Sequence, residues 1–148
     1  GHYRPELERQ AASLGLNGHV RFVGQVPAGD PVRAYLDRAD LFCLPSHQEG
    51  LPRAMIEAMA RGLPCIGSTV GGFPELLSED EMVPPGDAVA LAYHIRQVVG
   101  DPARMARLSA RNLDKAREYT NSVLDGRRVA FYRYLMNRTR EWHKHKEQ

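Results

Sequence analysis

The sequence carries little net charge, and this shortage excludes one class of protein at once. Its 148 residues include 20 Lys and Arg against 18 Asp and Glu, which leaves a net charge of +2. Proteins that bind nucleic acid through its phosphates need a larger basic excess, and the sequence also lacks interleaved basic and aromatic residues. Nucleic acid is therefore not an expected partner.

Long apolar runs and paired cysteines are missing as well. No apolar stretch approaches the ~20 residues of a membrane-spanning helix, and the first residues do not form a signal-peptide pattern. The two cysteines, Cys43 and Cys65, stand in apolar stretches without a paired spacing, as is typical of buried thiols in a reducing compartment. We expect a cytoplasmic protein, with peripheral contact at the inner face of a membrane as the alternative.

No metal or other cofactor is expected, because the sequence has no acidic cluster with ligand spacing and its histidines are scattered.

Short apolar segments alternate with helical patterns of about ten residues. The predicted strands are residues 20–23, 41–44, 64–67 and 82–83. The predicted helices between them begin at Pro5, Asp30–Pro31 and Pro52. The apolar run 41–44 is typical of a strand buried on both faces of a parallel sheet. The alternation predicts an α/β fold, a Rossmann-like open parallel sheet with helices on both faces.

From Asp87 onward the pattern is helical only. We expect residues 1–120 to form one domain whose first strand is missing or truncated, because the chain enters a helix directly. Residues 121–148 would form a C-terminal helix and basic tail that packs on or beyond this domain. The tail from Arg127 has seven Lys and Arg against two Asp and Glu. A solvated helix face is its plain interpretation, and contact with another domain or with anionic lipid are the alternatives.

The most informative stretch follows the predicted strand 41–44. Its loop lies at the carboxyl edge of the sheet, where ligands bind in open α/β folds. Gly50 leaves room for a close backbone approach, and the helix that starts at Leu51–Pro52 turns its first N–H groups toward the loop, as phosphate sites do. Glu49 and Glu57 add carboxylates that suit sugar hydroxyls. Together these features predict a nucleotide sugar as the ligand.

Plainer interpretations of the same residues remain open at this point. Arg53, Glu57 and Arg61 are spaced four residues apart, as in a solvent-facing stripe of ion pairs. Glu49 also fits an ordinary surface carboxylate. Gly71–Gly72 fit a plain turn as well as a phosphate loop.

The stretch resembles the signature of family 4 of the retaining glycosyltransferases, which have the GT-B fold. That signature sets two glutamates, with seven residues between them, in the pattern PS-x-x-EG followed by EAMA-x-G-x-P and then GG-x-PE. The matching positions are Pro45–Ser46, Glu49–Pro52, Glu57–Ala60, Gly62, Pro64 and Gly71–Glu75. The resemblance extends over about residues 1–120.

The resemblance implies that this chain is the C-terminal, donor-binding half of a GT-B glycosyltransferase. The donor would be a UDP-, GDP- or ADP-linked sugar, transferred as a hexosyl group with retention, as in polysaccharide biosynthesis. Glu49 would be the catalytic residue at the donor sugar, and Glu57 would bind the ribose hydroxyls. The other implied donor-binding residues are Gly50, Leu51, Pro52 and Arg53 at the sugar and diphosphate, and Gln25 and Val26 beside the base.

Arg53 departs from the family, because many members carry a small or apolar residue there. It either reaches phosphate or pairs with Glu57. Gly71 and Gly72 would support the site rather than touch the ligand. The resemblance also places the basic pair that neutralises the diphosphate upstream of Gly1, and the acceptor site in an N-terminal domain. The chain alone is therefore expected not to transfer sugar.

Two other classes of function compete with this interpretation. A non-catalytic module that binds a nucleotide or sugar phosphate is the alternative, although the presence of both Glu49 and Glu57 argues against it. A dinucleotide-dependent oxidoreductase requires G-x-G-x-x-G after a strand, and the sequence has no such motif.

Overall fold

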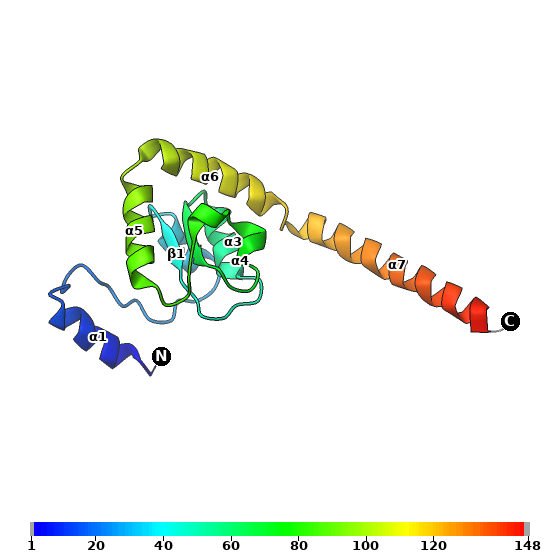
Figure 1. Ribbon diagram of the computed structural model, residues 1–148, viewed down its shortest axis with the longest axis horizontal. Helices are drawn as coiled ribbons and strands as arrows, with labels where there is room; N and C mark the ends of the chain where they lie inside the picture. The colour runs from blue at the N-terminus through cyan, green and yellow to red at the C-terminus, as the bar shows by residue number, and fades with distance from the viewer. Residues whose placement is uncertain (1, 147–148) are drawn as a thin grey trace. The chain divides into compact units, whose positions relative to one another are not determined.

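The computed structural model describes residues 2–146 of the chain, with side chains to Trp142. The chain divides into two compact units, the first ending at Tyr35 and the second beginning at Leu36 (Figure 1). The extent of a nucleotide-sugar domain over residues 1–120 stays a prediction.

The first unit contains the predicted helix but not the predicted strand. Helix α1 (Arg4–Ser13) has a proline in its first turn, where the missing N–H costs no hydrogen bond. The strand predicted at residues 20–23 is wrong, since residues 20–27 adopt no regular secondary structure. A strand depends on a ladder of hydrogen bonds to a neighbour, and the strands of the described residues pair only with one another.

Helix α2 (Asp30–Leu36) follows, close to its predicted start. Its buried face is small. Leu36 is buried, whereas Tyr35 is 40% exposed and stacks under the Arg21 guanidinium at 5.8 Å from its ring centre. The tyrosine hydroxyl also accepts a hydrogen bond from Arg21 at 3.2 Å. This contact holds the Tyr35 ring at the surface.

The second unit is built on a parallel sheet of three strands in the order β1 (Phe42–Leu44), β2 (Cys65–Ser68) and β3 (Met82–Val83). Phe42 lies opposite Cys65, and Gly67 lies opposite Met82. All three strands lie within one residue of their predicted positions. Their brevity fits the sequence, where a proline stands at one end of each apolar run, at Pro45, Pro64 and Pro84.

Helices cover both faces of this sheet (Figure 1). On one face, Ile66 packs in a core cluster with Val83, Val98 and Leu108. Val98 belongs to helix α5 (Ala88–Val99), which therefore packs on this face. Gly67, the residue after Ile66, points to the opposite face because side chains alternate along a strand. There Phe73 of helix α4 (Phe73–Leu76) lies so close that a Cβ on Gly67 would overlap its ring. The predicted α/β fold is confirmed.

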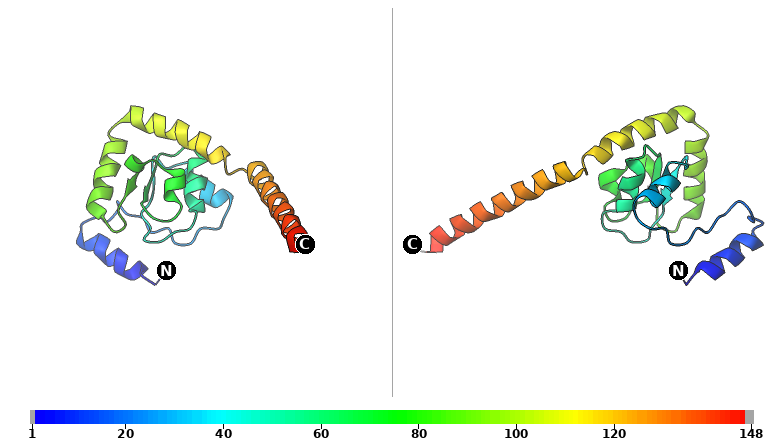
Figure 2. Two further views of the ribbon diagram at one scale, coloured as in Figure 1. Left: turned by 45° about the vertical axis from the view of Figure 1, so that its right-hand side comes forward. Right: turned by 180° about the vertical axis from the view of Figure 1, so that it is seen from behind.

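Helix α6 (Pro102–Arg117) packs on both α5 and helix α3 (Arg53–Met59) (Figure 2). Asp101 caps α6 by accepting a hydrogen bond from the N–H of Arg104 at 2.9 Å. A short 3-10 turn, η1 (Glu79–Glu81), precedes β3. Helix α7 (Asn121–Lys146) ends the described chain, and its described side chains are exposed except Leu124, which is half-buried. None of the helices traced here combines the length and apolar character that crossing a membrane requires.

Candidate functional site at the carboxyl edge of the sheet

The loops that follow the three strands come together at one edge of the sheet. The N–H of Gly72, after β2, donates to the carbonyl oxygen of Gly50, after β1, at 2.8 Å. The ring of His47, after β1, lies 3.1 Å from where a Cβ on Gly86, after β3, would stand. Ligands bind outside the carboxyl ends of strands in open α/β sheets. The loops after the strands therefore meet at the edge where the sequence predicts the site, and ligand binding there stays a prediction.

Glu49 is half-buried in the loop after β1. The hydroxyl of Ser46 donates to one oxygen of its carboxylate at 2.9 Å. The hydroxyl of the buried Ser68, at the end of β2, donates to the Ser46 carbonyl oxygen. The loop thus holds the carboxylate through two serines from adjacent strand ends. Sequence reasoning did not foresee these serine contacts, although the spacing of Ser46 three residues before Glu49 is a visible signal.

The glycine pair after β2 packs directly under this loop. Gly71 has a φ of +53°, and a Cβ on it would overlap the carbonyl oxygen of Glu49. A Cβ on Gly72 would lie 2.9 Å from the carbonyl oxygen of Gly50. Only glycine fits both positions, because the neighbours are backbone atoms that cannot rotate away. The pair contacts the backbone that carries Glu49, in agreement with a supporting role.

Helix α3 carries the remaining predicted donor-site residues of the second unit. Pro52 is buried and stands at its N-cap position, and no side chain caps the helix. Leu51, Arg53 and Glu57 are exposed, whereas the opposite side of α3 buries Met55 and its neighbours against the core. Arg53 and Glu57 are one turn apart on the open side of the helix.

The predicted stripe of ion pairs along α3 is not formed. Arg61 pairs with Asp37, from the start of the second unit, rather than with Glu57. Neither Arg53 nor Glu57 has an ion pair with any side chain that the structure describes. A carboxylate and a guanidinium thus face solvent next to the Glu49 loop.

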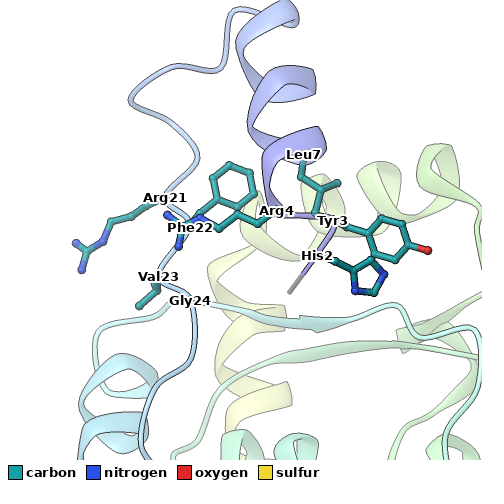
Figure 3. A pocket seen from close by; sticks show the side chains of 8 residues that line it. All are labelled: His2, Tyr3, Arg4, Leu7, Arg21, Phe22, Val23 and Gly24. Carbon is teal, nitrogen blue, oxygen red and sulfur yellow. The ribbon is translucent and has the colours of Figure 1, made fainter.

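Gln25 and Val26 belong to the first unit. Gln25 is exposed and Val26 is half-buried. They come directly after Gly24 in the sequence. Gly24 is one of the residues that line a pocket of about 410 Å³, together with residues 2–4, 7 and 21–23 (Figure 3). Their proximity to a nucleobase stays a prediction, as do the ligand contacts of all the site residues.

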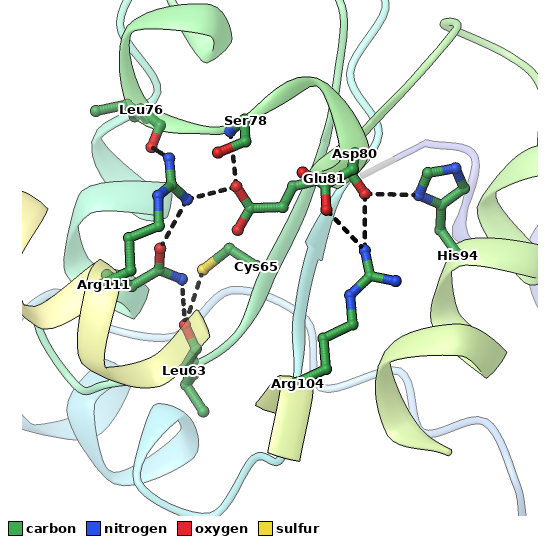
Figure 4. Close-up of polar contacts among 10 residues, drawn as sticks. Leu63, Cys65, Leu76, Ser78, Asp80, Glu81, His94, Arg104 and Arg111 are labelled. Carbon is green, nitrogen blue, oxygen red and sulfur yellow. Dashed lines mark hydrogen bonds and ion pairs between the residues drawn. The ribbon is translucent and has the colours of Figure 1, made fainter. Parts of the chain in front are cut away.

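A polar network that the sequence did not reveal lies beneath η1 (Figure 4). Glu81 is 1% exposed, and its carboxylate pairs with Arg111 of α6. The same carboxylate oxygen accepts the N–H of Ser78 at 2.6 Å. Arg111 also donates to the carbonyl oxygen of Leu76 at 3.0 Å. Glu81 and Arg111 are 30 positions apart in sequence, so no local pattern links them.

The same network continues to β2. The buried Asn112 donates to the carbonyl oxygen of Leu63 at 2.8 Å, and the thiol of Cys65 donates to that oxygen at 3.3 Å. Burial, and then the negative charge of Glu81, raises the pKa of the Cys65 thiol far above its ordinary value. Burial also raises the pKa of Cys43. These shifts favour the neutral thiol at both positions, in the buried Cys65 and the half-buried Cys43.

Within the part of the chain that the structure describes, no three His, Cys, Asp or Glu side chains are grouped to hold a metal ion. The expectation that no metal takes part stays a prediction.

The family model for glycosyl transferases group 1 matches residues 1–115. An α/β sheet with an acidic loop at its carboxyl edge fits this class of enzyme, and the chain belongs to the glycosyl transferases group 1 family. The amylovoran biosynthesis glycosyltransferase AmsK of Erwinia amylovora is 40% identical over 101 residues, which cover 62% of this chain and 25% of AmsK.

Solved structures agree with this assignment. Sucrose-phosphate synthase from Thermosynechococcus elongatus is 30% identical with a TM-score of 0.81, over 93% of this chain and 35% of the other. Anabaena Alr3699/HepE, solved in complex with UDP, is 27% identical with a TM-score of 0.78, over 88% of this chain and 36% of the other. The chain thus spans between a quarter and about a third of the length of these proteins.

Proposed function

We propose that this chain is the C-terminal, donor-binding half of a retaining family 4 glycosyltransferase, which transfers a hexosyl group from a nucleotide-diphosphate sugar to an acceptor. The observation that carries the proposal is the joining of the Glu49 loop to the Gly71–Gly72 turn at the carboxyl edge of the sheet. The likeness to Alr3699/HepE, a protein solved with UDP, supports a nucleotide diphosphate as the ligand.

Glu49 is proposed to contact hydroxyls of the donor sugar. Its carboxylate is half-buried and is oriented by Ser46, which lowers the entropy that ordering it on a ligand would cost. Hydrogen bonds from hydroxyls to a carboxylate are charge-assisted and stronger than neutral ones. The backbone of Gly50, Leu51 and Pro52 then lies at the sugar and the diphosphate.

Glu57 and Arg53 are proposed to bind the ribose and the diphosphate. Both are exposed on α3 and have no ion-pair partner among the described side chains, so binding would not first have to break a pair. Arg53 is at the first position of the helix, where anions are also favoured by the helix dipole. Gln25 and Val26 are proposed to lie beside the base through their backbone.

Transfer is proposed to need an N-terminal acceptor domain. Departure of the diphosphate requires stabilisation of its charge, and a closed cleft is required to exclude water. Glu49, Arg53 and Glu57 provide one basic group against two acidic groups, which leaves the diphosphate charge largely uncompensated. The chain alone is expected to bind the donor without turning it over.

Calorimetric titration with UDP, GDP and ADP tests the binding site. We expect one nucleotide to bind in preference, and Glu57→Ala to weaken it roughly 10- to 100-fold, as expected for the loss of a charged hydrogen bond. Glu79→Ala, which removes an exposed carboxylate from η1, is the matched control and should leave the affinity unchanged. Equal affinity in both variants, or no nucleotide bound even when the N-terminal domain is present, would contradict the proposal.

A turnover assay separates a transferase from a non-catalytic binding module. In the chain joined to its N-terminal domain, Glu49→Gln keeps the shape of the side chain and removes its charge. We expect kcat to fall at least about 10²-fold while nucleotide affinity stays within a few-fold, because the charge is needed at the reacting sugar. Unchanged kcat would argue against a catalytic role for Glu49.

A further inference from the structure

We propose that Arg111 is a positioning residue for the Glu49 loop, acting through α4 and the Gly71–Gly72 turn. This inference rests on the proposed function, since it assigns its purpose to the orientation of the donor site. It also gives a role to the buried network of Figure 4, which contains none of the predicted ligand-binding residues.

Arg111 binds both ends of the segment that connects α4 to β3, at Leu76 and at Glu81. One terminal nitrogen of its guanidinium donates to the carbonyl oxygen of Leu76, the last residue of α4, at 3.0 Å. The other pairs with Glu81, at the end of η1. A guanidinium is a planar fork with fixed donor directions, so it sets the two ends at a defined separation.

Helix α4 transmits this constraint to the glycine turn. It has four residues, and Gly72 is its N-cap. Phe73 is completely buried against Gly67 and Leu76 is 1% exposed, so the helix is clamped to the sheet along its length. A displacement of Leu76 therefore moves Gly72. Gly72 in turn donates its N–H to Gly50 at 2.8 Å.

The Glu49 loop has no room to absorb such a displacement. The carbonyl oxygen of Glu49 lies against the α-carbon of Gly71 so tightly that even a Cβ would overlap it. A shift of the turn must therefore shift the backbone that carries the Glu49 carboxylate. The path from Arg111 runs by a hydrogen bond to Leu76, along the backbone of α4 to Gly72, and by a second hydrogen bond to Gly50.

The composition of the network also favours a positional role over a purely stabilising one. Taking Glu81 out of water costs free energy, and well-packed apolar residues often stabilise a core as much or more than a buried ion pair. One oxygen of Glu81, Oε1, has no hydrogen-bond partner among the residues that the structure describes. A pair that is incompletely satisfied is a poor source of stability, but its directional bonds fix geometry, which apolar packing does not.

Hydrogen exchange of the Gly72 amide tests the coupling without any ligand. Arg111→Lys keeps the positive charge but lacks the planar guanidinium that donates to two partners at once. We therefore expect the Gly72 amide to exchange about 10-fold faster, as measured by NMR, and the exchange of the Ile66 amide in the core strand to be unchanged. Arg104→Met is the matched control. Arg104 lies on the same helix and bonds Asp80 of the same 3-10 turn, but it has no contact with α4 among its described bonds.

Two results would overturn the inference. One is an unchanged Gly72 exchange rate in Arg111→Lys, and the other is an equal acceleration at Gly72 and Ile66, which would indicate a merely structural role. Arg104→Met should leave the Gly72 amide within about twofold of the unmodified chain.

Ligand binding provides a second measurement. We expect Arg111→Lys to weaken UDP-glucose about 10-fold and UDP by less than about threefold, since the displaced Glu49 is proposed to contact only the sugar, while Arg53 and Glu57 on α3 would still bind the nucleotide. Equal weakening of both ligands would contradict the positioning of a sugar contact. If neither ligand binds even in the chain joined to its N-terminal domain, the proposed function fails, and the exchange rates alone still decide whether Arg111 holds the turn.

Discussion

The backbone N–H of Gly72 donates to the carbonyl oxygen of Gly50 at 2.8 Å, and this bond joins the loops that follow two adjacent parallel strands. It brings a glycine turn under a loop that carries the half-buried Glu49. Adjacent parallel strands end at the same edge, so their loops are neighbours in any such sheet. In this chain two consecutive glycines allow the two backbones to touch.

Replacement of Gly71 by alanine should disrupt both stability and the donor site. Its φ of +53° disfavours any side chain, and the added Cβ would overlap the Glu49 carbonyl oxygen. We expect Gly71→Ala to lower the free energy of unfolding by at least about 3 kcal/mol, and to weaken nucleotide-sugar binding in the fraction that folds. Urea unfolding followed by circular dichroism measures the first effect.

Gly86→Ala is the matched control for Gly71→Ala. Gly86 also has a positive φ, of +81°, but its neighbour is the ring of His47, which can rotate away. Only the backbone strain of about 1 kcal/mol should remain. Equal losses in the two variants would show that the contact with Glu49 adds nothing.

Local sequence patterns correctly predicted the helices and strands whose positions depend mainly on neighbouring residues in the sequence. The apolar run at 41–44 and the proline that follows it placed β1 within one residue. The prediction of a strand at residues 20–23 is wrong. Alternating polar and apolar residues indicate that two sides of a segment differ in polarity, but not that a neighbouring strand is present to pair with it.

Long-range pairs could not be predicted from spacing. The four-residue interval between Glu57 and Arg61 suggested an ion pair, yet Arg61 bonds Asp37, which is 24 positions away. The Glu81–Arg111 pair likewise spans 30 positions. In the sequence, Glu81 is the last of three consecutive acidic residues, and nothing distinguishes it from the other two. Its burial depends on the contact that η1 makes with Arg111 of α6.

Glu57→Ala should leave the fold intact. Glu57 is exposed and has no ion pair among the described side chains, so the free energy of unfolding should change by less than about 0.5 kcal/mol. Arg61→Ala breaks a half-exposed pair with Asp37 and should cost up to about 1 kcal/mol. Thermal unfolding of both variants tests this order. A large loss in Glu57→Ala would mean that any fall in nucleotide affinity is indirect.

Asn112 should be a costly polar residue of α6 to replace. It is fully buried and donates to the carbonyl oxygen of Leu63 at 2.8 Å. Asn112→Ala would leave a cavity and weaken the bonding of that buried oxygen, at a cost of about 2–3 kcal/mol. Asn137→Ala, at an exposed position of α7, should be nearly neutral in the same urea titration. A neutral Asn112→Ala would contradict the burial of this side chain.

Alkaline pH should destabilise the fold through its buried thiols. Burial, reinforced by Glu81, raises the pKa of Cys65 above the ordinary value of 9.0, and burial raises that of Cys43. The folded state therefore keeps these protons at a pH where the unfolded chain releases them. Stability from this source is complete below about pH 9 and is lost above it, by up to about 1.4 kcal/mol per pH unit for each thiol.

Urea unfolding between about pH 7 and pH 10.5 measures this loss as the slope of the unfolding free energy against pH. A Cys43→Ala, Cys65→Ala double variant serves as the comparison, because every other titrating group is retained. Above about pH 9, we expect the unfolding free energy of the variant to fall less steeply with pH than that of the unmodified chain. The difference between the two slopes is the contribution of the two thiols, and it does not depend on how much the two truncations lower the stability itself. Parallel curves for the two proteins would mean that the thiols ionise equally in the folded and unfolded chains, which their burial does not allow.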